Sequence, residues 1–135
     1  MADKLFHIEI ITPEKVLVSE DIESLEAPGV SGEFQILADH TPFLTGLKTG
    51  PVIFSKSGRK TFISISGGFC EVQPEKAVIL AHTAEHSGEI DVKRAEAARD
   101  RALKRLESDD PDVDMKRAEA ALARALNRLK VAEMK

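Results

Sequence analysis

The C-terminal part of the chain contains one 19-residue stretch twice, and this repeat constrains the fold more than any other feature. Residues 90–108 and 113–131 align without a gap at an offset of 23 and agree at 12 of 19 positions. Both copies are rich in Ala, Arg, Leu, Glu and Lys, which favour helices. The connector, residues 107–114 (ESDDPDVD), holds the only proline after Gly88. The repeat therefore predicts two similar helices joined by a short loop.

Aspartates stand where both helices are expected to begin. Asp91 can cap the first by accepting backbone amide hydrogen bonds, and Asp112 or Asp114 can cap the second. Because the connector is short, the helices should pack antiparallel. The packing stripes are expected to be Val92, Ala95, Ala98, Ala102 and Leu106 in the first helix and Met115, Ala118, Leu122, Ala125, Leu129 and Ala132 in the second. Alanines bury little area, so this hairpin should be close-packed but weakly held.

The N-terminal part has a different pattern, with short apolar runs separated by Pro and Gly from Leu5 to Ala81. In the segment HIEI, alternation places Ile8 and Ile10 on one face and His7 on the other. The runs of strand length are FHIEII, VLV, FQIL, TFISIS and KAVILA. Four glycines mark positions where the backbone should turn or be approached closely: Gly29, Gly32, Gly67 and Gly68. These features predict an all-β sandwich or barrel.

Composition excludes several classes of protein. A single cysteine, Cys70, cannot form an internal disulfide, which is typical of a reducing compartment. With 4% aromatic residues and no Trp or Tyr, the chain lacks stacking platforms for single-stranded nucleic acid. Charges interrupt the apolar residues near the N-terminus, and no apolar run reaches membrane-spanning length. We therefore expect a cytoplasmic protein that binds no nucleic acid and reaches a membrane only through a partner.

The charge is distributed unevenly. Residues 1–89 hold 7 Lys/Arg against 13 Asp/Glu, a net of −6, whereas residues 90–135 hold 12 against 10, a net of +2. The two parts therefore differ in charge as well as in predicted structure. We expect a β domain over residues 1–86 and a helical domain over residues 87–135.

Arginines recur at the same positions of both copies. They are Arg94, Arg101 and Arg105 in the first and Arg117, Arg124 and Arg128 in the second. Spacings of seven and four place each set on one helix face. Folding the hairpin brings these rows together, so they must flank the seam on opposite sides or hold an anion, and guanidinium groups suit the oxygens of a polyphosphate. Alternatively the arginines only solvate the helices, and the repeat alone indicates a symmetric hairpin rather than a ligand.

Other motifs are weaker. His82-Thr-Ala-Glu85-His86 matches the His-x-x-Glu-His pattern of some zinc proteases, but it follows a strand-like run, and that pattern works only on a helix. The chain contains no Gly-x-x-x-x-Gly-Lys-Ser/Thr loop, so a bound nucleotide is not expected to be hydrolysed. Cys70 has no activating neighbour in the sequence and is interpreted as a small buried side chain.

Three segments together resemble the epsilon subunit of the bacterial F-type ATP synthase. They are PGVSGEFQILADHTPFLT (residues 28–45), ISGGFCEV (residues 65–72), and Ile90-Asp91-x-x-Arg94-Ala95 before a helical hairpin. The match covers the whole chain. The resemblance implies a flattened β-sandwich of about ten strands, followed by an antiparallel two-helix hairpin.

The resemblance also implies a function. In that family the sandwich docks on the gamma subunit and the ring of c subunits, and so turns with the rotor. The hairpin either folds against the sandwich or extends along gamma toward the alpha/beta subunits, where it blocks ATP hydrolysis. The expected protein is non-catalytic, with no catalytic residue and no metal ligand of its own. It would lie peripherally at the cytoplasmic face of the plasma membrane, as part of the synthase.

In similar members the folded hairpin binds ATP without hydrolysing it. Carried over by position, the resemblance implies that Glu85, Ile90 and Asp91 hold the adenosine end and that Ala95 lies against the nucleotide. It implies that the phosphates are held by Arg94, Arg101, Arg124 and Arg128. ATP would then be a regulatory ligand that favours the compact hairpin.

Two other functions stay open at this point. One is a purely structural coupling subunit whose helices never bind ATP. The other is a β-sandwich adaptor whose basic hairpin binds nucleic acid or an anionic membrane. Adaptor binding should weaken steadily as salt rises, whereas a defined pocket should prefer ATP over GTP at fixed salt.

Overall fold

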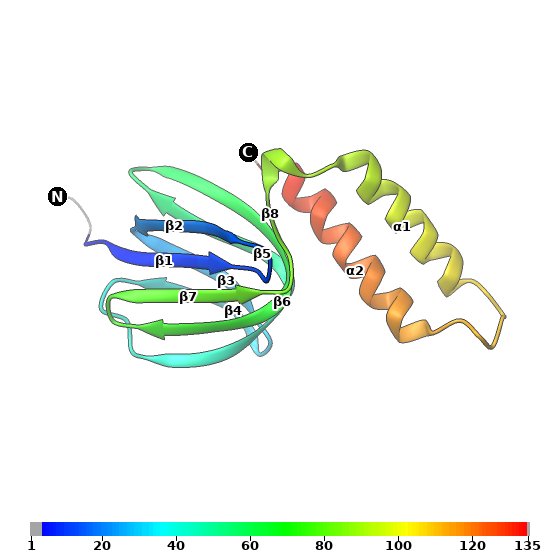
Figure 1. The fold of residues 1–135 in the computed structure, drawn as a ribbon, viewed down its shortest axis with the longest axis horizontal. Helices are drawn as coiled ribbons and strands as arrows, with labels where there is room; N and C mark the ends of the chain where they lie inside the picture. The colour runs from blue at the N-terminus through cyan, green and yellow to red at the C-terminus, as the bar shows by residue number, and fades with distance from the viewer. Residues whose placement is uncertain (1–3, 135) are drawn as a thin grey trace.

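The computed structural model describes residues 4–134 and consists of eight strands followed by two helices (Figure 1). The strands are β1 (Phe6–Ile11), β2 (Val16–Ile22), β3 (Ser24–Gly29), β4 (Gly32–Leu37), β5 (Phe43–Lys56), β6 (Arg59–Gln73), β7 (Lys76–Ala81) and β8 (Ala84–His86). A 3-10 turn, η1 (Ser87–Glu89), leads to α1 (Val92–Leu106) and α2 (Met115–Ala132). The predicted order, a β part followed by a helical hairpin, is confirmed.

The strands form one hydrogen-bonded path in the order β2-β1-β7-β6-β5-β3-β4, with β8 paired to β6. β1 and β7 are parallel, and the other pairs are antiparallel. Buried side chains of β1, β2, β3, β4, β5, β6 and β7 share one hydrophobic core, which is mostly aliphatic. The sheet therefore folds over on itself as a sandwich, as predicted (Figure 1).

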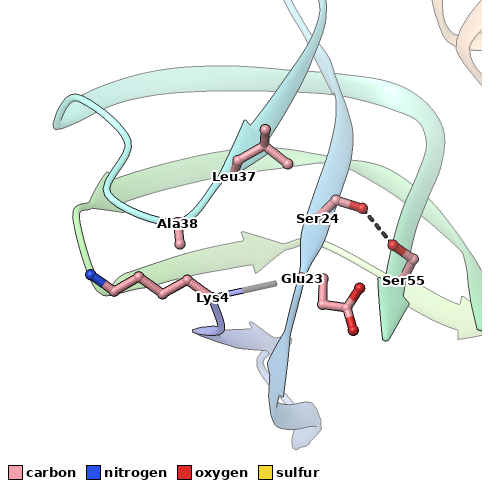
Figure 2. Close-up of a pocket in the computed structure, with 6 residues that line it drawn as sticks. All are labelled: Lys4, Glu23, Ser24, Leu37, Ala38 and Ser55. Atoms are coloured by element: carbon pink, nitrogen blue, oxygen red, sulfur yellow. Dashed lines mark hydrogen bonds between the residues drawn. The ribbon is translucent and has the colours of Figure 1, made fainter. Parts of the chain in front are cut away.

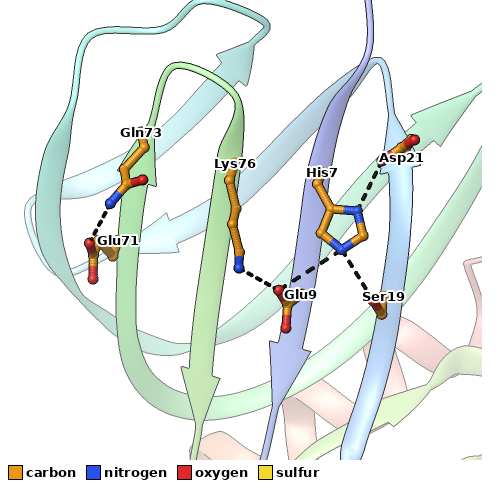
Figure 3. A network of polar contacts seen from close by, with 7 residues as sticks. All are labelled: His7, Glu9, Ser19, Asp21, Glu71, Gln73 and Lys76. Carbon is orange, nitrogen blue, oxygen red and sulfur yellow. Dashed lines mark hydrogen bonds and ion pairs between the residues drawn. The ribbon is translucent and has the colours of Figure 1, made fainter.

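The alternation in β1 is confirmed. Ile8 and Ile10 are fully buried, while the opposite face carries polar contacts between neighbouring strands (Figure 3). His7 Nδ1 lies 2.9 Å from Asp21 Oδ1, and Lys76 Nζ lies 2.6 Å from Glu9 Oε1. The hydrogen bond from Lys76 lowers the pKa of the Glu9 carboxyl. This outer face is a solvated network on the β2-β1-β7 part of the sheet.

The number of strands differs from the expected ten or so. β5 and β6 are 14 and 15 residues long and run without a break through glycines and Pro51, where the sequence suggested turns. At Gly67 and Gly68, φ is 101° and 146°, so β6 bends and continues instead of ending. After this bend β6 pairs with β7, and before it with β8. The two long strands β5 and β6 thus extend along the sandwich where shorter strands were expected. Residues 4–134 therefore form eight strands.

Gly68 is also a point of close approach, as predicted. A Cβ atom at Gly68 would lie 1.9 Å from the carbonyl oxygen of Leu80 on β7. Two residues further along β6, Cys70 is fully buried, and burial raises the pKa of its thiol to about 12. The interpretation of Cys70 as a small buried side chain is therefore confirmed.

The helices pack antiparallel beside one end of the sandwich (Figure 1). The predicted alanine seam is confirmed, because Ala95, Ala102, Ala118 and Ala125 are each at most 3% exposed. The first residues of the two stripes lie outside this seam, with Val92 43% and Met115 38% exposed. Each is the first residue of its helix, and side chains there point back beyond the helix end.

Gly68→Ala should destabilise the sandwich, because the added methyl group meets the Leu80 carbonyl and the backbone is left-handed at this position. We expect the free energy of unfolding to fall by about 2–4 kcal/mol, measured by urea denaturation. Gly88→Ala is the matched control, since a Cβ there meets nothing within 4 Å. Equal denaturation midpoints for the two variants would contradict the prediction.

Candidate functional site

A cavity of about 450 Å³ lies where the start of α1 meets the end of α2 and the last strand of the sandwich. This volume is within the roughly 300–1,000 Å³ of small-molecule sites. Its lining residues come from β8, η1 and both helices: Glu85, Glu89, Asp91, Arg94, Ala95, Ala98, Arg101 and Arg128. The cavity therefore exists only while the hairpin is folded beside the sandwich.

Six of the eight predicted site residues line this cavity. They are Glu85, Asp91, Arg94, Ala95, Arg101 and Arg128. Ile90 and Arg124 are not among the lining residues. Ile90 is 8% exposed and directly precedes the N-cap residue, and Arg124 is half-buried on α2. Ala98 and Glu89 complete the lining and were not predicted.

Arg128 and Glu85 join the two parts of the molecule inside the cavity. Arg128 Nε donates to Glu85 Oε1 at 2.5 Å, and the two side chains are 29% and 35% exposed. The contact links α2 to β8 and holds the guanidinium group beside the cavity. Partial exposure screens this ion pair, so its contribution to stability is modest.

Arg94 and Arg101 supply the other positive charges. Within residues 4–134 neither side chain has a carboxylate within 4.0 Å. Both come from α1, whereas Arg128 comes from α2, so the cations converge from both helices. Three lining carboxylates balance three lining guanidinium groups, which leaves the site near neutrality without a ligand.

Asp91 shapes the helix end at the cavity. Its Oδ1 accepts a hydrogen bond from the backbone N–H of Arg94 at 3.0 Å, which confirms the predicted N-cap. In the second helix the cap is Asp114, which accepts from the N–H of Arg117 at 3.1 Å. The positive end of the α1 dipole thus faces the cavity and adds to the attraction for an anion.

Asn127 is the important residue that sequence reasoning missed. It is 8% exposed, and its Nδ2 donates to Ser64 Oγ at 3.0 Å and to the Ile65 carbonyl at 3.4 Å. These hydrogen bonds tie α2 to β6. One signal could have found it: the repeat has Lys104 at the equivalent position, so only the second copy is adapted to burial.

Asn127→Ala should loosen the docking of α2, because it removes both hydrogen bonds and leaves the Ser64 hydroxyl in an apolar contact. The expected loss is about 1–3 kcal/mol, seen as faster amide hydrogen exchange in α2. Lys104→Ala is the control, since this exposed residue occupies the same position of the first copy. Similar exchange in both variants would show that Asn127 does not fasten the helix.

The sandwich has a hollow of its own, of about 300 Å³, near the start of β3 and the ends of β4 and β5 (Figure 2). Its lining residues are Lys4, Glu23, Ser24, Leu37, Ala38 and Ser55. The polar groups here already contact protein partners: Ser24 Oγ lies 2.5 Å from Ser55 Oγ, and Lys4 Nζ pairs with Asp39 at 2.8 Å. The cavity beside the hairpin is therefore the better candidate for a ligand.

The His82–His86 pattern does not lie on a helix. Residues 84–86 form strand β8, so the arrangement that zinc proteases need is absent from this segment. Among residues 4–134, no cluster of three or more His, Cys, Asp or Glu side chains could hold a metal ion. Neither described helix is both long and apolar enough to span a membrane.

The fold and the cavity define a class of protein: a β-sandwich that carries a helical hairpin with an anion-compatible site between its helices. Family models described as the ATP synthase delta/epsilon chain match residues 5–87, as the beta-sandwich domain, and residues 89–133, as the long alpha-helix domain. The chain belongs to the ATP synthase delta/epsilon chain family. Chains of this family are accessory subunits of ATP synthase and not its catalytic ones.

Similar proteins agree with this assignment. An ATP synthase epsilon chain from Desulfosudis oleivorans is 50% identical over 109 residues, covering 80% of this chain and 81% of the relative. That of Geobacter sulfurreducens is 43% identical over 115 residues, covering 83% of each. Both identities are well above the level at which a shared family is evident.

Solved structures are similar at the level of the fold. A chain of the Euglena gracilis mitochondrial ATP synthase superposes with a TM-score of 0.79 at 23% identity, covering 91% of this chain and 78% of that one. A chain in the central stalk and c-ring structure of the Tetrahymena thermophila enzyme gives 0.62 at 14% identity, covering 98% and 96%.

Proposed function

We propose that this protein is a central-stalk rotor subunit of an F-type ATP synthase whose hairpin senses ATP. The sandwich would dock on the gamma subunit and the c ring, and the protein would lie at the cytoplasmic face of the plasma membrane through that complex. The observation that carries the regulatory part is the convergence of Arg94 and Arg101 from α1 with Arg128 from α2 in one cavity.

Exposed apolar side chains support docking through the sandwich. Phe69 on β6 and Leu80 on β7 are direct cross-strand neighbours and are 57% and 53% exposed. Leu44 on β5 is 70% exposed, and Val30 in the turn after β3 is 63% exposed. A group of large apolar side chains in water is typical of a protein interface. Two of these four residues, Val30 and Leu44, lie within residues 28–45, one of the segments that carry the family resemblance.

ATP would bind the folded hairpin much better than an open one, because its phosphates need guanidinium groups from both helices. Opening the hairpin separates Arg128 from Arg94 and Arg101, so these residues no longer line one cavity. A ligand with such differential affinity shifts the equilibrium toward the compact state. At low ATP the hairpin would extend toward the alpha/beta subunits and inhibit ATP hydrolysis.

The ion pair between Glu85 and Arg128 prepares this site. Glu85 holds the guanidinium group of Arg128 beside the cavity before any ligand arrives, so less side-chain entropy is lost on binding. A guanidinium group has five donors, and Arg128 can therefore contact Glu85 and a phosphate together. Glu85 and Asp91 would face the adenosine end, with Ile90 supporting the helix start from behind.

Arg101→Gln should weaken ATP binding about tenfold or more in isothermal titration calorimetry, because it removes a charge-assisted contact to phosphate. Arg99→Gln is the matched control, since Arg99 pairs with Asp100, does not line the cavity, and is replaced by Leu122 in the second copy. Equal ATP affinities for the two variants would reject the phosphate role of Arg101.

Arg124→Gln and Arg128→Gln test the α2 side of the site in the same experiment. Arg128 lines the cavity, so its loss should weaken ATP binding at least as much as the loss of Arg101. Weakening by Arg124→Gln would require this half-buried side chain to turn toward the phosphates in the bound state. Unchanged affinity in both variants would leave α2 without a part in ATP binding.

Titrations of the protein with ATP and with GTP, each at low and at raised salt, separate the other two functions. A purely structural coupling subunit would show no heat of binding with ATP or GTP. An adaptor for anionic polymers would bind both nucleotides equally and lose affinity as salt rises. Preference for ATP at fixed salt is expected for the nucleotide-sensing hairpin.

A further inference from the structure

The two helices are related by an approximate two-fold axis, because a repeated sequence is folded into an antiparallel pair. Both helices begin with an aspartate cap of nearly the same geometry: φ and ψ are −78° and 95° at Asp91, and −81° and 102° at Asp114. The axis exchanges the start of α1 with the start of α2. It therefore also exchanges the sandwich end of the hairpin with its turn end (Figure 1).

The turn end has a cavity of its own, of about 410 Å³. Its lining residues are Arg105, Asp112, Val113, Asp114, Arg117 and Ala118. At the repeat offset of 23, these residues correspond in turn to Arg128, Glu89, Ile90, Asp91, Arg94 and Ala95. Five of the six counterparts line the cavity at the sandwich end of the hairpin. The sixth, Ile90, is the buried residue that precedes the N-cap residue Asp91. The turn-end cavity is thus a second copy of the first.

Cations from both helices meet again at this second cavity. Arg105 comes from the last turn of α1 and Arg117 from the first turn of α2, and both side chains are exposed. Within residues 4–134, neither has a carboxylate within 4.0 Å. Asp114 is already engaged by the backbone N–H of Arg117. Two guanidinium groups on different helices thus face one hollow, and neither contacts the Asp112 and Asp114 carboxylates that also line it.

We propose that the turn end of the hairpin is a second binding site for a polyphosphate, either free or as the phosphate chain of a nucleotide. The choice of ligand rests on the proposed ATP site, whose residues the second cavity repeats. A ligand there would bridge the end of α1 and the start of α2, so it would also favour the folded hairpin.

The second site should be weaker and less selective for a base than the first. It is lined by two guanidinium groups, because Arg124, the counterpart of Arg101, does not line it. Glu85 lies on β8, outside the repeat, and has no counterpart at the turn end, so no ion pair holds Arg105 in place. The Asp112 carboxylate opposes an anion, as Glu89 does in the first cavity. Phosphate chemistry is repeated at the turn end, whereas the contacts at the sandwich are not.

A backbone NMR titration of the full chain with ATP and with tripolyphosphate, at constant ionic strength, tests this proposal. We expect both ligands to shift the amides of residues 113–118, at concentrations at least tenfold higher than ATP needs to shift residues 91–95. Tripolyphosphate has no base, so a comparable response to both ligands at residues 113–118 identifies the phosphates as the recognised group.

Three double variants locate the two sites. Arg105→Gln with Arg117→Gln should abolish the shifts at residues 113–118 and keep those at residues 91–95. Arg94→Gln with Arg128→Gln should do the reverse. Lys104→Gln with Lys116→Gln removes the same charge from exposed neighbours outside the lining and should change neither set.

The outcomes separate the second site from the proposed ATP site. No shift at residues 113–118 with either ligand up to about 10 mM overturns the second site, whatever happens at residues 91–95. It is also overturned if those shifts persist in the Arg105/Arg117 variant, vanish in the Arg94/Arg128 variant, or are reproduced by chloride. If ATP leaves residues 91–95 unchanged while residues 113–118 respond as expected, the ATP site fails and the second site stands.

Discussion

The close contact of α1 and α2 through alanine is the interaction on which the hairpin and its site depend. Ala95 and Ala102 pack against a seam that contains Ala118 and Ala125, and all four are almost completely buried. Small side chains let the helix axes approach toward the lower end of the usual ~8–10 Å. That approach brings arginines of both helices around one cavity. The same side chains bury little apolar area, so the seam that forms the site holds it only weakly.

The sandwich breaks the symmetry of the hairpin by binding one helix. Asn127 and Val131 of α2 are buried, and their counterparts in the first copy, Lys104 and Ser108, are not fully buried. Glu85 adds an ion pair to Arg128 at the same junction. One end of the hairpin therefore receives a third wall from β8 and η1, while the turn end is built from the two helices and their connector. A duplicated sequence thereby produces two unequal cavities.

Local patterns predicted much of the fold, and tertiary contacts explain the rest. FHIEII and KAVILA became strands with the expected bounds, and residues 107–114 separate the helices as expected. β5 and β6 were not foreseen as continuous, because Gly67 and Gly68 bend a strand here instead of ending it. Six of the eight proposed site residues line the cavity. Four of them lie on helices, and Glu85 and Asp91, which lie outside the helices, followed from the family resemblance. The partner of Asn127 is 63 residues away, which no helical period encodes.

A weak seam is what makes ATP an effective regulator in the proposed function. A ligand that binds only the folded hairpin and is present at about 100 times its dissociation constant stabilises that state by about 2.7 kcal/mol. The hydrogen bonds of Asn127 and the partly exposed Glu85–Arg128 pair contribute a similar amount, since each such contact adds about 1 kcal/mol. With leucines along the seam, the folded state would prevail with or without ligand. With alanines, the terms are comparable, and the nucleotide concentration can decide whether the hairpin stays folded.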